Sequence, residues 1–269
     1  MHDTVAPLAS TRFTPSTGQR PATELYAQVA HDFADKLQRS QALLQTAAQQ
    51  HGARLTQASS LGAEDMVVSH LIQSLGLEIG IFVLDTGMLH AETIQLLATL
   101  QQMHGERVTV YRPQSQSVID FVTREGQDAM YRSIALRKHC CQLRKMEPLS
   151  RALEGKTGWI TGLRREQSGA RAEVPMIDTS ESASTKFNPL AEWTWGDVWH
   201  YIAQEGVAYN PLHDRFFPSI GCEPCTRAIA LGEDFRAGRW WWEDESAKEC
   251  GLHATSEAPP SSETRGNLT

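Results

Sequence analysis

The stretch Glu78–Gly87 reads E-I-G-I-F-V-L-D-T-G, a nearly unbroken apolar run that ends in Asp85, Thr86 and Gly87. Such a run without polar alternation is typical of a strand buried on both faces, as in a parallel sheet. A helical pattern follows at about Glu92–Met103. A strand, a loop with glycine and a helix in this order predict one unit of an α/β domain.

The same unit recurs on both sides of this stretch. Further strands are predicted at Arg54–Ser59, Arg107–Tyr111 and Gly158–Gly162, and a helix is predicted from the loop after Ser59 through Leu75. We therefore expect an α/β fold with an open, mainly parallel sheet and helices on both faces. Ligands of such sheets bind outside the carboxyl ends of the strands.

Three loops with a glycine fall at that edge: S-S-L-G-A-E-D, L-D-T-G-M-L-H and T-G-L-R-R-E-Q-S. Gly62, Gly87 and Gly162 allow close backbone approach, and the helix that opens after Gly62 offers free amide groups to an anion. The loops follow neither the G-x-G-x-x-G nor the Walker A pattern, so they favour another type of nucleotide site. Glu64 and Asp65 are expected to cap the helix or to contact the nucleotide.

Composition narrows the class of protein. The 269 residues carry a formal net charge of −7, which argues against a nucleic-acid partner. The longest apolar run, about Ile79–Leu84, is far too short to span a membrane, and we see no secretory signal before Thr23. Cysteines without such a signal predict reduced thiols in a cytoplasmic protein. Residues 1–22 and 254–269 are rich in Pro, Ser and Thr and are expected to be disordered tails.

The five cysteines form two close pairs and one single residue: Cys140 and Cys141, Cys222 and Cys225, and Cys250. A C-x-x-C motif supplies two ligands from one turn, and four thiolates suit either Zn²⁺ or a [4Fe–4S] cluster. Neighbouring side chains normally diverge, so the adjacent pair requires a bent backbone to bind one centre. The spacing predicts four cysteines that hold a metal or iron–sulfur centre and one that is left for chemistry.

These residues lie in an ordered set of motifs: G-A-E-D, L-D-T-G-x-L-H-x-E-T, C-C-x-x-R-K-x-E-P-L, T-G-x-R-R-x-Q-S, K-F-N-P-L, I-G-C-E-P-C-T-R, G-R-W-W-W-E and K-E-C-G-L-H. With this set the chain resembles the assimilatory adenylyl-sulfate (adenosine 5′-phosphosulfate) reductases over roughly His51–His253. The resemblance implies a fold of the adenine-nucleotide α-hydrolase type and a [4Fe–4S] cluster. It also implies cytoplasmic sulfate assimilation toward cysteine, with thioredoxin or a glutaredoxin-like protein as reductant.

The resemblance also assigns roles to residues. Cys140, Cys141, Cys222 and Cys225 match the cluster ligands, and Cys250 matches the nucleophile. Lys145 and His253 match two further catalytic positions. The expected substrate-binding residues are Ser59, Ser60, Gly62, Asp65, Leu84, Thr86, Gly162, Arg165, Arg236 and Arg239. Many relatives read S-x-S-G in the first loop, whereas Leu61 stands here at the second serine, so Ser59 or Ser60 and backbone amides are expected to contact the phosphate.

The implied domain is residues 23–240, which would hold the nucleotide and the iron–sulfur centre, followed by a mobile segment at 241–253 that carries Cys250. We expect the Cys250 thiolate to attack the substrate's sulfur, expel AMP and form a Cys–S–SO₃⁻ adduct. Lys145, Arg236 and Arg239 would neutralise the anionic substrate. A reductant thiolate would then release sulfite. The reductant is expected to be a separate protein, and a homo-oligomer stays open.

Alternatives follow from the same residues. Related phosphoadenylyl-sulfate reductases lack the two cysteine pairs, so the pairs favour the un-phosphorylated substrate, with the 3′-phosphorylated one or both as the rival. A zinc-stapled nucleotide-binding protein without a redox role is a second rival, which a colourless preparation would favour. A sulfur-inserting tRNA enzyme on the same fold would want an S-G-G-x-D-S loop and a more basic surface, and the sequence has neither.

Overall fold

The computed structural model describes residues 20–180 and 184–244. These residues form a six-stranded sheet in the order β3-β2-β1-β4-β6-β5, in which each neighbouring pair is parallel except β5 with β6. The mainly parallel sheet predicted from the apolar runs is therefore confirmed. The strands are β1 (Leu55–Ser59), β2 (Gly80–Leu84), β3 (Val108–Tyr111), β4 (Gly158–Ile160), β5 (Ile177–Asp178) and β6 (Thr185–Phe187).

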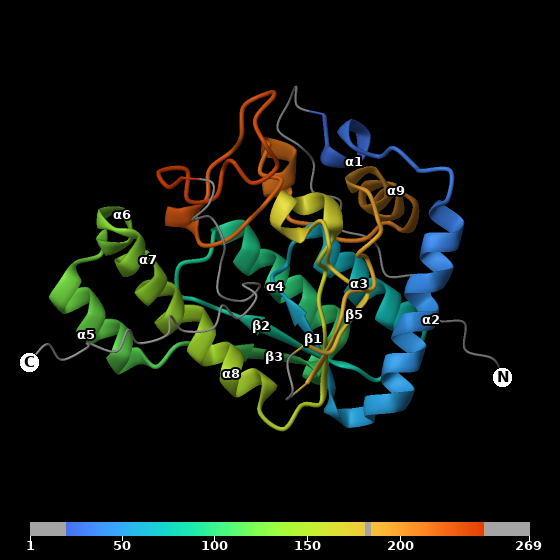
Figure 1. Cartoon of the computed structure of the whole chain (residues 1–269), viewed down its shortest axis with the longest axis horizontal. Helices are drawn as coiled ribbons and strands as arrows, with labels where there is room; N and C mark the ends of the chain where they lie inside the picture. The colour runs from blue at the N-terminus through green and yellow to red at the C-terminus, as the bar shows by residue number, and fades with distance from the viewer. Residues whose placement is uncertain (1–19, 181–183, 245–269) are drawn as a thin grey trace, which may run out of the picture.

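Helices surround the sheet (Figure 1). The helix α2 lies at one side of the molecule, and α5, α6 and α7 gather at the other. The helices are α1 (Ala22–Leu25), α2 (Phe33–His51), α3 (Ala63–Ser74), α4 (Ala91–His104), α5 (Ser115–Glu125), α6 (Ala129–Arg132), α7 (Ile134–Cys141), α8 (Glu147–Leu153) and α9 (Trp195–Glu205). Within the described ranges, no helix has the length and apolar character needed to cross a bilayer.

The side chains of β2 show that both faces of the sheet are covered. Ile81 and Val83 belong to the main core, together with apolar residues of α2, α3, α4 and α9. Phe82, between them, packs instead with Leu149 and Ala152 of α8. Successive side chains of a strand point to opposite faces, so one strand contributes to two apolar layers. This two-sided burial explains why the stretch is apolar without alternation.

Parallel pairing brings the predicted loops to one edge. Strands β1, β2 and β4 are parallel neighbours, and they end at Ser59, Leu84 and Ile160. The loops that follow these three residues therefore leave the sheet in the same direction and lie side by side. The candidate functional site lies at this carboxyl edge of the sheet.

The backbone is altered directly after the vicinal cysteines. Helix α7 ends at Cys141 and is followed by a π-helical segment, Gln142–Met146, before α8 begins. A π-helical turn is wider than an α-helical one and is frequent at functional sites. The two cysteines themselves lie in regular helix, where a bent backbone was expected, and the widened turn comes directly after them and carries Lys145.

Two features were not predicted in detail. The fourth strand ends at Ile160, two residues earlier than expected, and the short strands β5 and β6 form the far edge of the sheet. At the N-terminus, Ala22 is buried, and its amide donates a 2.7 Å hydrogen bond to Asp214. The proposed boundary of the tail at residue 22 stays a prediction, because residues 1–19 lie outside the described part of the chain.

Candidate active site

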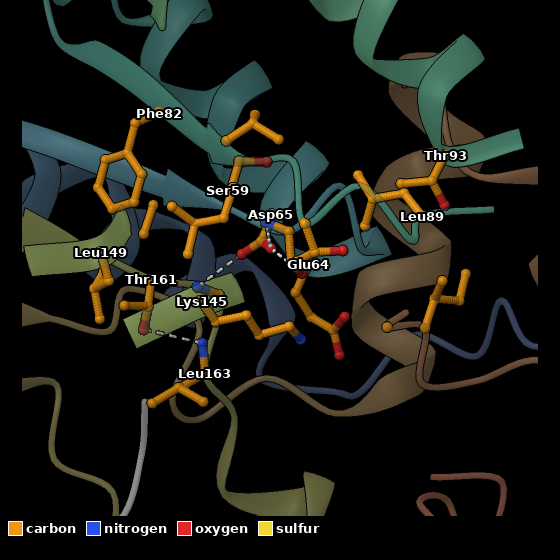
Figure 2. A pocket seen from close by; sticks show the side chains of 18 of the residues that line it. Ser59, Glu64, Asp65, Phe82, Leu89, Thr93, Lys145, Leu149, Thr161 and Leu163 are labelled. Carbon is orange, nitrogen blue, oxygen red and sulfur yellow. Dashed lines mark hydrogen bonds between the residues drawn. The ribbon is translucent and has the colours of Figure 1, made fainter. Parts of the chain in front are cut away.

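The carboxyl edge of the sheet holds a cavity of about 180 Å³. This first cavity is called the nucleotide-type cavity below. Ser59, Leu84, Thr86 and Gly162, from the three predicted loops and strand ends, contribute to its wall, and Lys145 reaches it from the π-helical segment. Figure 2 shows Lys145 near Glu64 and Asp65, with Phe82 and Leu149 on the apolar side. An apolar wall facing a group of charged side chains suits a ligand with a planar ring and an anionic group.

Asp65 joins the first and third loops. One of its carboxylate oxygens accepts hydrogen bonds from the amide and the hydroxyl of Ser60, both at 2.7 Å, and the other accepts from the Gly162 amide at 3.1 Å. A Cβ atom at position 162 would lie 2.6 Å from that second oxygen, so the approach requires glycine. Burial raises the pKa of Asp65 to about 6 against the effect of these hydrogen bonds.

Glu64 anchors a second network on the same wall. Its carboxylate accepts a 2.9 Å bond from Nε of Arg164 and a 3.0 Å bond from the Gln167 amide. Gln167 in turn accepts a 2.6 Å bond from Arg171, which also lines the cavity. Arg164 is fully buried, and Arg171, which is also buried, lines the cavity. Neither Gln167 nor Arg171 was predicted from the sequence as a site residue.

The first loop has no serine contact from position 61. Leu61 adopts a left-handed backbone, with φ of 63°, and its side chain is 1% exposed within the main core. The Ser59 hydroxyl accepts a 3.2 Å bond from the Leu61 amide, and the Ser60 hydroxyl donates to Asp65. No side chain caps the N-terminus of α3 after Gly62. Free helix amides, rather than a hydroxyl at 61, are therefore the groups available to an anion.

The second loop connects the cavity with the cysteines. Thr86, whose side chain lines the cavity, lies 3.2 Å from the sulfur of Cys222 in a hydrogen bond. The Arg144 guanidinium donates a 2.7 Å bond to the carbonyl of Thr86. Leu89 pairs with Cys222 in an antiparallel bridge, and the Glu223 amide donates to the Met88 carbonyl at 2.8 Å. These contacts join the second loop, which follows β2, directly to the C-x-x-C motif.

The two cysteine pairs come together on a small second cavity. Cys140, Cys141, Cys222 and Cys225 all line it and carry free thiols, and Cys140, Cys222 and Cys225 are buried. Burial, followed by the neighbouring Cys222 sulfur, raises the pKa of Cys225 to about 12. Three cations border the same cavity, namely Arg137, Arg144 and Lys145.

A four-thiolate centre fits this donor set. Thiolates from two motifs on one cavity are the ligand chemistry of [4Fe–4S] clusters and structural zinc, and the bordering cations offset thiolate charge. Among the described residues, no three Cys, His, Asp or Glu side chains are spaced as a ready metal site. The fit therefore rests on the four sulfurs that share one cavity.

Lys145 belongs to both cavities. Its side chain lines the nucleotide-type cavity and the cysteine cavity alike. An ammonium group at this junction lies where an anion would extend from the first cavity toward the cysteines. Figure 2 shows the amine turned toward the acidic residues of the first cavity.

Arg236 and Arg239 gather on the same side as the C-x-x-C motif. The Arg239 guanidinium lies against Gly221, where a Cβ atom would come within 2.3 Å of Nη2, and Gly221 lines the first cavity. Both guanidinium groups face the ring of Trp240, at 4.7 Å for Arg239 and 5.9 Å for Arg236. Arg239 therefore both stacks on the Trp240 indole and approaches the cavity.

Arg165 is not brought into this arrangement. It does not line the cavity, donates a 2.9 Å bond to the Val174 carbonyl and lies 3.4 Å from Glu192. Cys250 and His253 lie outside the residues that the structure describes. Their roles stay predictions, as does that of Arg165.

Residues 54–228 match the phosphoadenosine phosphosulfate reductase domain family. The chain is 49% identical over 229 residues to an adenosine 5′-phosphosulfate reductase of Burkholderia cepacia, covering 85% of this chain and 91% of that protein. It is 50% identical to an adenosine 5′-phosphosulfate reductase of Allochromatium vinosum, covering 75% of this chain and 79% of that protein.

Solved structures agree on the fold. A phosphoadenylyl-sulfate reductase from Candida auris aligns with a TM-score of 0.59 at 23% identity, covering 75% of this chain and 98% of that one. An FMN adenylyltransferase from Candida glabrata aligns with a TM-score of 0.52 at 11% identity, covering 85% of this chain and 81% of that one. The family match and the aligned relatives cover most of the chain, so the chain belongs to the phosphoadenosine phosphosulfate reductase domain family that includes these adenosine 5′-phosphosulfate reductases.

Proposed function

We propose that this protein reduces adenosine 5′-phosphosulfate to sulfite and AMP, with thioredoxin or a glutaredoxin-like protein as electron donor, in sulfate assimilation toward cysteine. The observation that carries the proposal is the position of Lys145, which lines both the nucleotide-type cavity and the cavity of the four cysteines. The names of the relatives that align over most of the chain support the same substrate. The paired cysteines favour the un-phosphorylated nucleotide, and the cytoplasm is the expected compartment for their thiols.

The substrate would enter with its adenosine in the first cavity, against the apolar wall of Phe82 and Leu149. Its phosphosulfate would extend from the amides at the start of α3 toward Lys145 and Arg239. These cations reduce the repulsion between the substrate's negative charges and an incoming thiolate. Electrostatic stabilisation of this kind is a large part of catalysis of group transfer.

The chemistry proceeds in two thiol steps. The Cys250 thiolate attacks the sulfur, a new S–S bond forms, and the bond from sulfur to the phosphate oxygen breaks with its electron pair leaving on AMP. A reductant thiolate then attacks the Cys250 sulfur and expels sulfite as the resulting disulfide forms. The second thiol of the reductant resolves that disulfide and restores Cys250. The dithiol supplies the two electrons, so the balance is complete with thiols alone.

Cys140, Cys141, Cys222 and Cys225 would hold a [4Fe–4S] cluster. When bound, this cluster supplies a fixed charge and ligand bonds that hold both cysteine motifs in place beside Lys145. The hydrogen bond between Thr86 and Cys222 and the bond from Arg144 to the Thr86 carbonyl link those motifs to the loop that follows β2. Cluster binding and substrate placement are thereby expected to depend on each other.

Mass spectrometry after mixing the protein with adenosine 5′-phosphosulfate tests the proposal. We expect one added SO₃ on the peptide that contains Cys250, and loss of the adduct with release of sulfite when reduced thioredoxin is added. Cys250→Ser should form no adduct while still binding AMP. Sulfite production by that variant at the rate of the unaltered protein would refute the mechanism. A parallel measurement with the 3′-phosphorylated nucleotide separates the substrate from its rival.

A further inference from the structure

The segment Gly238–Glu243 is held against the second cysteine motif by its backbone. The Arg227 amide donates a 3.0 Å hydrogen bond to the Gly238 carbonyl, and the Trp240 amide donates a 3.2 Å bond to the Cys225 carbonyl. Between them, Arg239 pairs with Thr226 in an antiparallel bridge. These contacts attach the segment to the loop that carries Cys222 and Cys225.

A buried ion pair attaches the same segment to the first cysteine motif. Arg137 of α7 donates from Nε to Glu243 at 2.9 Å and from Nη2 at 2.6 Å, one bond to each carboxylate oxygen. The two side chains are 1% and 2% exposed. The Arg137 guanidinium also lies 4.6 Å from the centre of the Trp240 ring. Arg137 precedes Cys140 by one helical turn and lines the cysteine cavity.

The geometry of this ion pair is suited to holding the segment in one position. A forked arginine–carboxylate pair constrains both groups in one plane, which a single hydrogen bond does not. Buried ion pairs add little net stability compared with apolar residues of the same size, because both charges lose their hydration. The surroundings are largely apolar, with Met130, Phe121 and Trp240 in the same cluster as the cysteines, and the Arg137 side chain also forms a hydrogen bond with Cys141. The pair therefore calls for a role beyond stability.

We propose that Arg137 and Glu243 are positioning residues, whose ion pair fixes the start of the chain that leads to Cys250 relative to both cysteine motifs. Cys250 follows Glu243 by seven residues in the sequence, a run that can extend at most about 25 Å. An anchor at Glu243 therefore bounds the volume in which the Cys250 thiol meets substrate. The anchor lies close to the substrate side, because Arg239 of the same segment lies against Gly221 of the first cavity.

The inference rests on the proposed function for its kinetic part, but the anchor itself can be tested without turnover. Glu243→Gln keeps the shape of the side chain and removes its charge. Cleavage after Arg239 by an endoproteinase specific for arginine reports release of the segment, because Arg239 is buried within it, and cleavage after the buried Arg164 reports global unfolding. We expect faster cleavage after Arg239 in Glu243→Gln with Arg164 still protected.

The kinetic arm measures adduct formation on Cys250 in a single turnover at saturating adenosine 5′-phosphosulfate, corrected for iron content. We expect the rate to fall roughly 10- to 100-fold, as for small displacements of a reacting group, with the affinity for AMP unchanged. Glu125→Gln is the matched control, because it removes a carboxylate from the exposed pair with Arg132 near the same helices. It should change neither readout.

Glu243→Gln leaves the charge of Arg137 buried without Glu243 as its counter-ion, which lowers the stability of the whole fold. The double variant Arg137→Met with Glu243→Met removes both charges and keeps an apolar fit, and it must show the same local release and slower adduct formation. A rate of cleavage after Arg239 and an adduct rate equal to those of the unaltered protein, in a folded variant, would overturn the proposal. If the unaltered protein forms no adduct, the proposed function fails, while the cleavage assay still decides the anchor.

Discussion

Asp65 and Gly162 meet across the ends of two neighbouring parallel strands, with the Gly162 amide 3.1 Å from the Asp65 carboxylate. A side chain at position 162 would also lie 3.0 Å from the Asp65 amide. The first and third loops are therefore held at a separation that only glycine permits, and the cavity wall depends on that separation.

Gly162→Ala should weaken nucleotide binding. The added methyl group must displace Asp65, a kind of overpacking that costs about 1–3 kcal/mol. Calorimetric titration with AMP should give a lower affinity and thermal unfolding a lower midpoint. Gly169→Ala is the control, because a Cβ atom there meets no heavy atom within 4 Å and the backbone is not left-handed. Equal AMP affinity for the two variants would contradict this account of the cavity wall.

Arg171 should matter more for binding than Arg165. Arg171 lines the cavity, whereas Arg165 is directed to Val174 and Glu192. Loss of a charge-assisted hydrogen bond costs about 1.5–3 kcal/mol, or roughly 10- to 100-fold in affinity. Arg171→Ala should therefore reduce AMP affinity by that factor and Arg165→Ala should leave it nearly unchanged. The reverse order would restore Arg165 as the contact that the family resemblance predicts.

Restoring the serine at position 61 should not improve the loop. The Leu61 side chain is buried in the core and does not line the cavity. Leu61→Ser should lower the free energy of unfolding by roughly 2–4 kcal/mol through the cavity that it leaves. Urea unfolding measures this, with Leu61→Met as the volume-conserving control. A higher AMP affinity in Leu61→Ser would show that the hydroxyl reaches the ligand after all.

Asp65 should make stability fall as pH rises through the mildly acidic range. Its pKa is raised from 3.8 to about 6 in the folded state, so folding favours the protonated form. The contribution is fully present below the unfolded value of 3.8 and is lost as pH rises through about 6. A shift of this size corresponds to about 3 kcal/mol. Unfolding measured from pH 4 to 7 should show this slope relative to Asp65→Asn, and parallel curves would argue against it.

The visible spectrum should distinguish a cysteine that binds the cluster from the nucleophile Cys250. Cys222→Ser should abolish the broad absorbance near about 400 nm that a [4Fe–4S] protein shows, because a hydroxyl replaces one ligand. Cys250→Ser should keep the colour and lose the SO₃ adduct. A colourless unaltered protein that contains zinc would favour the zinc-stapled alternative.

The sheet and the three loops could be predicted because they depend on local pattern. The apolar run at Ile81–Leu84 requires burial on both faces, and parallel pairing then brings the loops of Gly62 and Gly162 to one edge. The spacing of the two cysteine pairs likewise predicted a shared centre, and the structure places all four cysteines on one cavity.

Other features depend on contacts between residues far apart in the sequence. Arg137 and Glu243 are 106 positions apart, and neither lies in a motif whose chemistry requires the other. The family resemblance pointed to Arg165, and Arg171 lies outside the motifs that carry it. The two residues stand on successive 3₁₀ turns, at 165–167 and 169–171, and of the two only Arg171 lines the cavity. The left-handed backbone at Leu61 was also not predictable, because leucine rarely adopts it.

The π-helical segment at Gln142–Met146 has a consequence for how this protein tolerates change. Each residue of a helix turns the chain by roughly 100°, so the direction of the Lys145 amine is set by the number of residues that separate it from Cys141. A deletion of one residue between Cys141 and Lys145 that restored regular α-helix would keep the lysine and both cysteines and still aim the amine elsewhere. Length within this turn, as much as composition, is therefore under constraint.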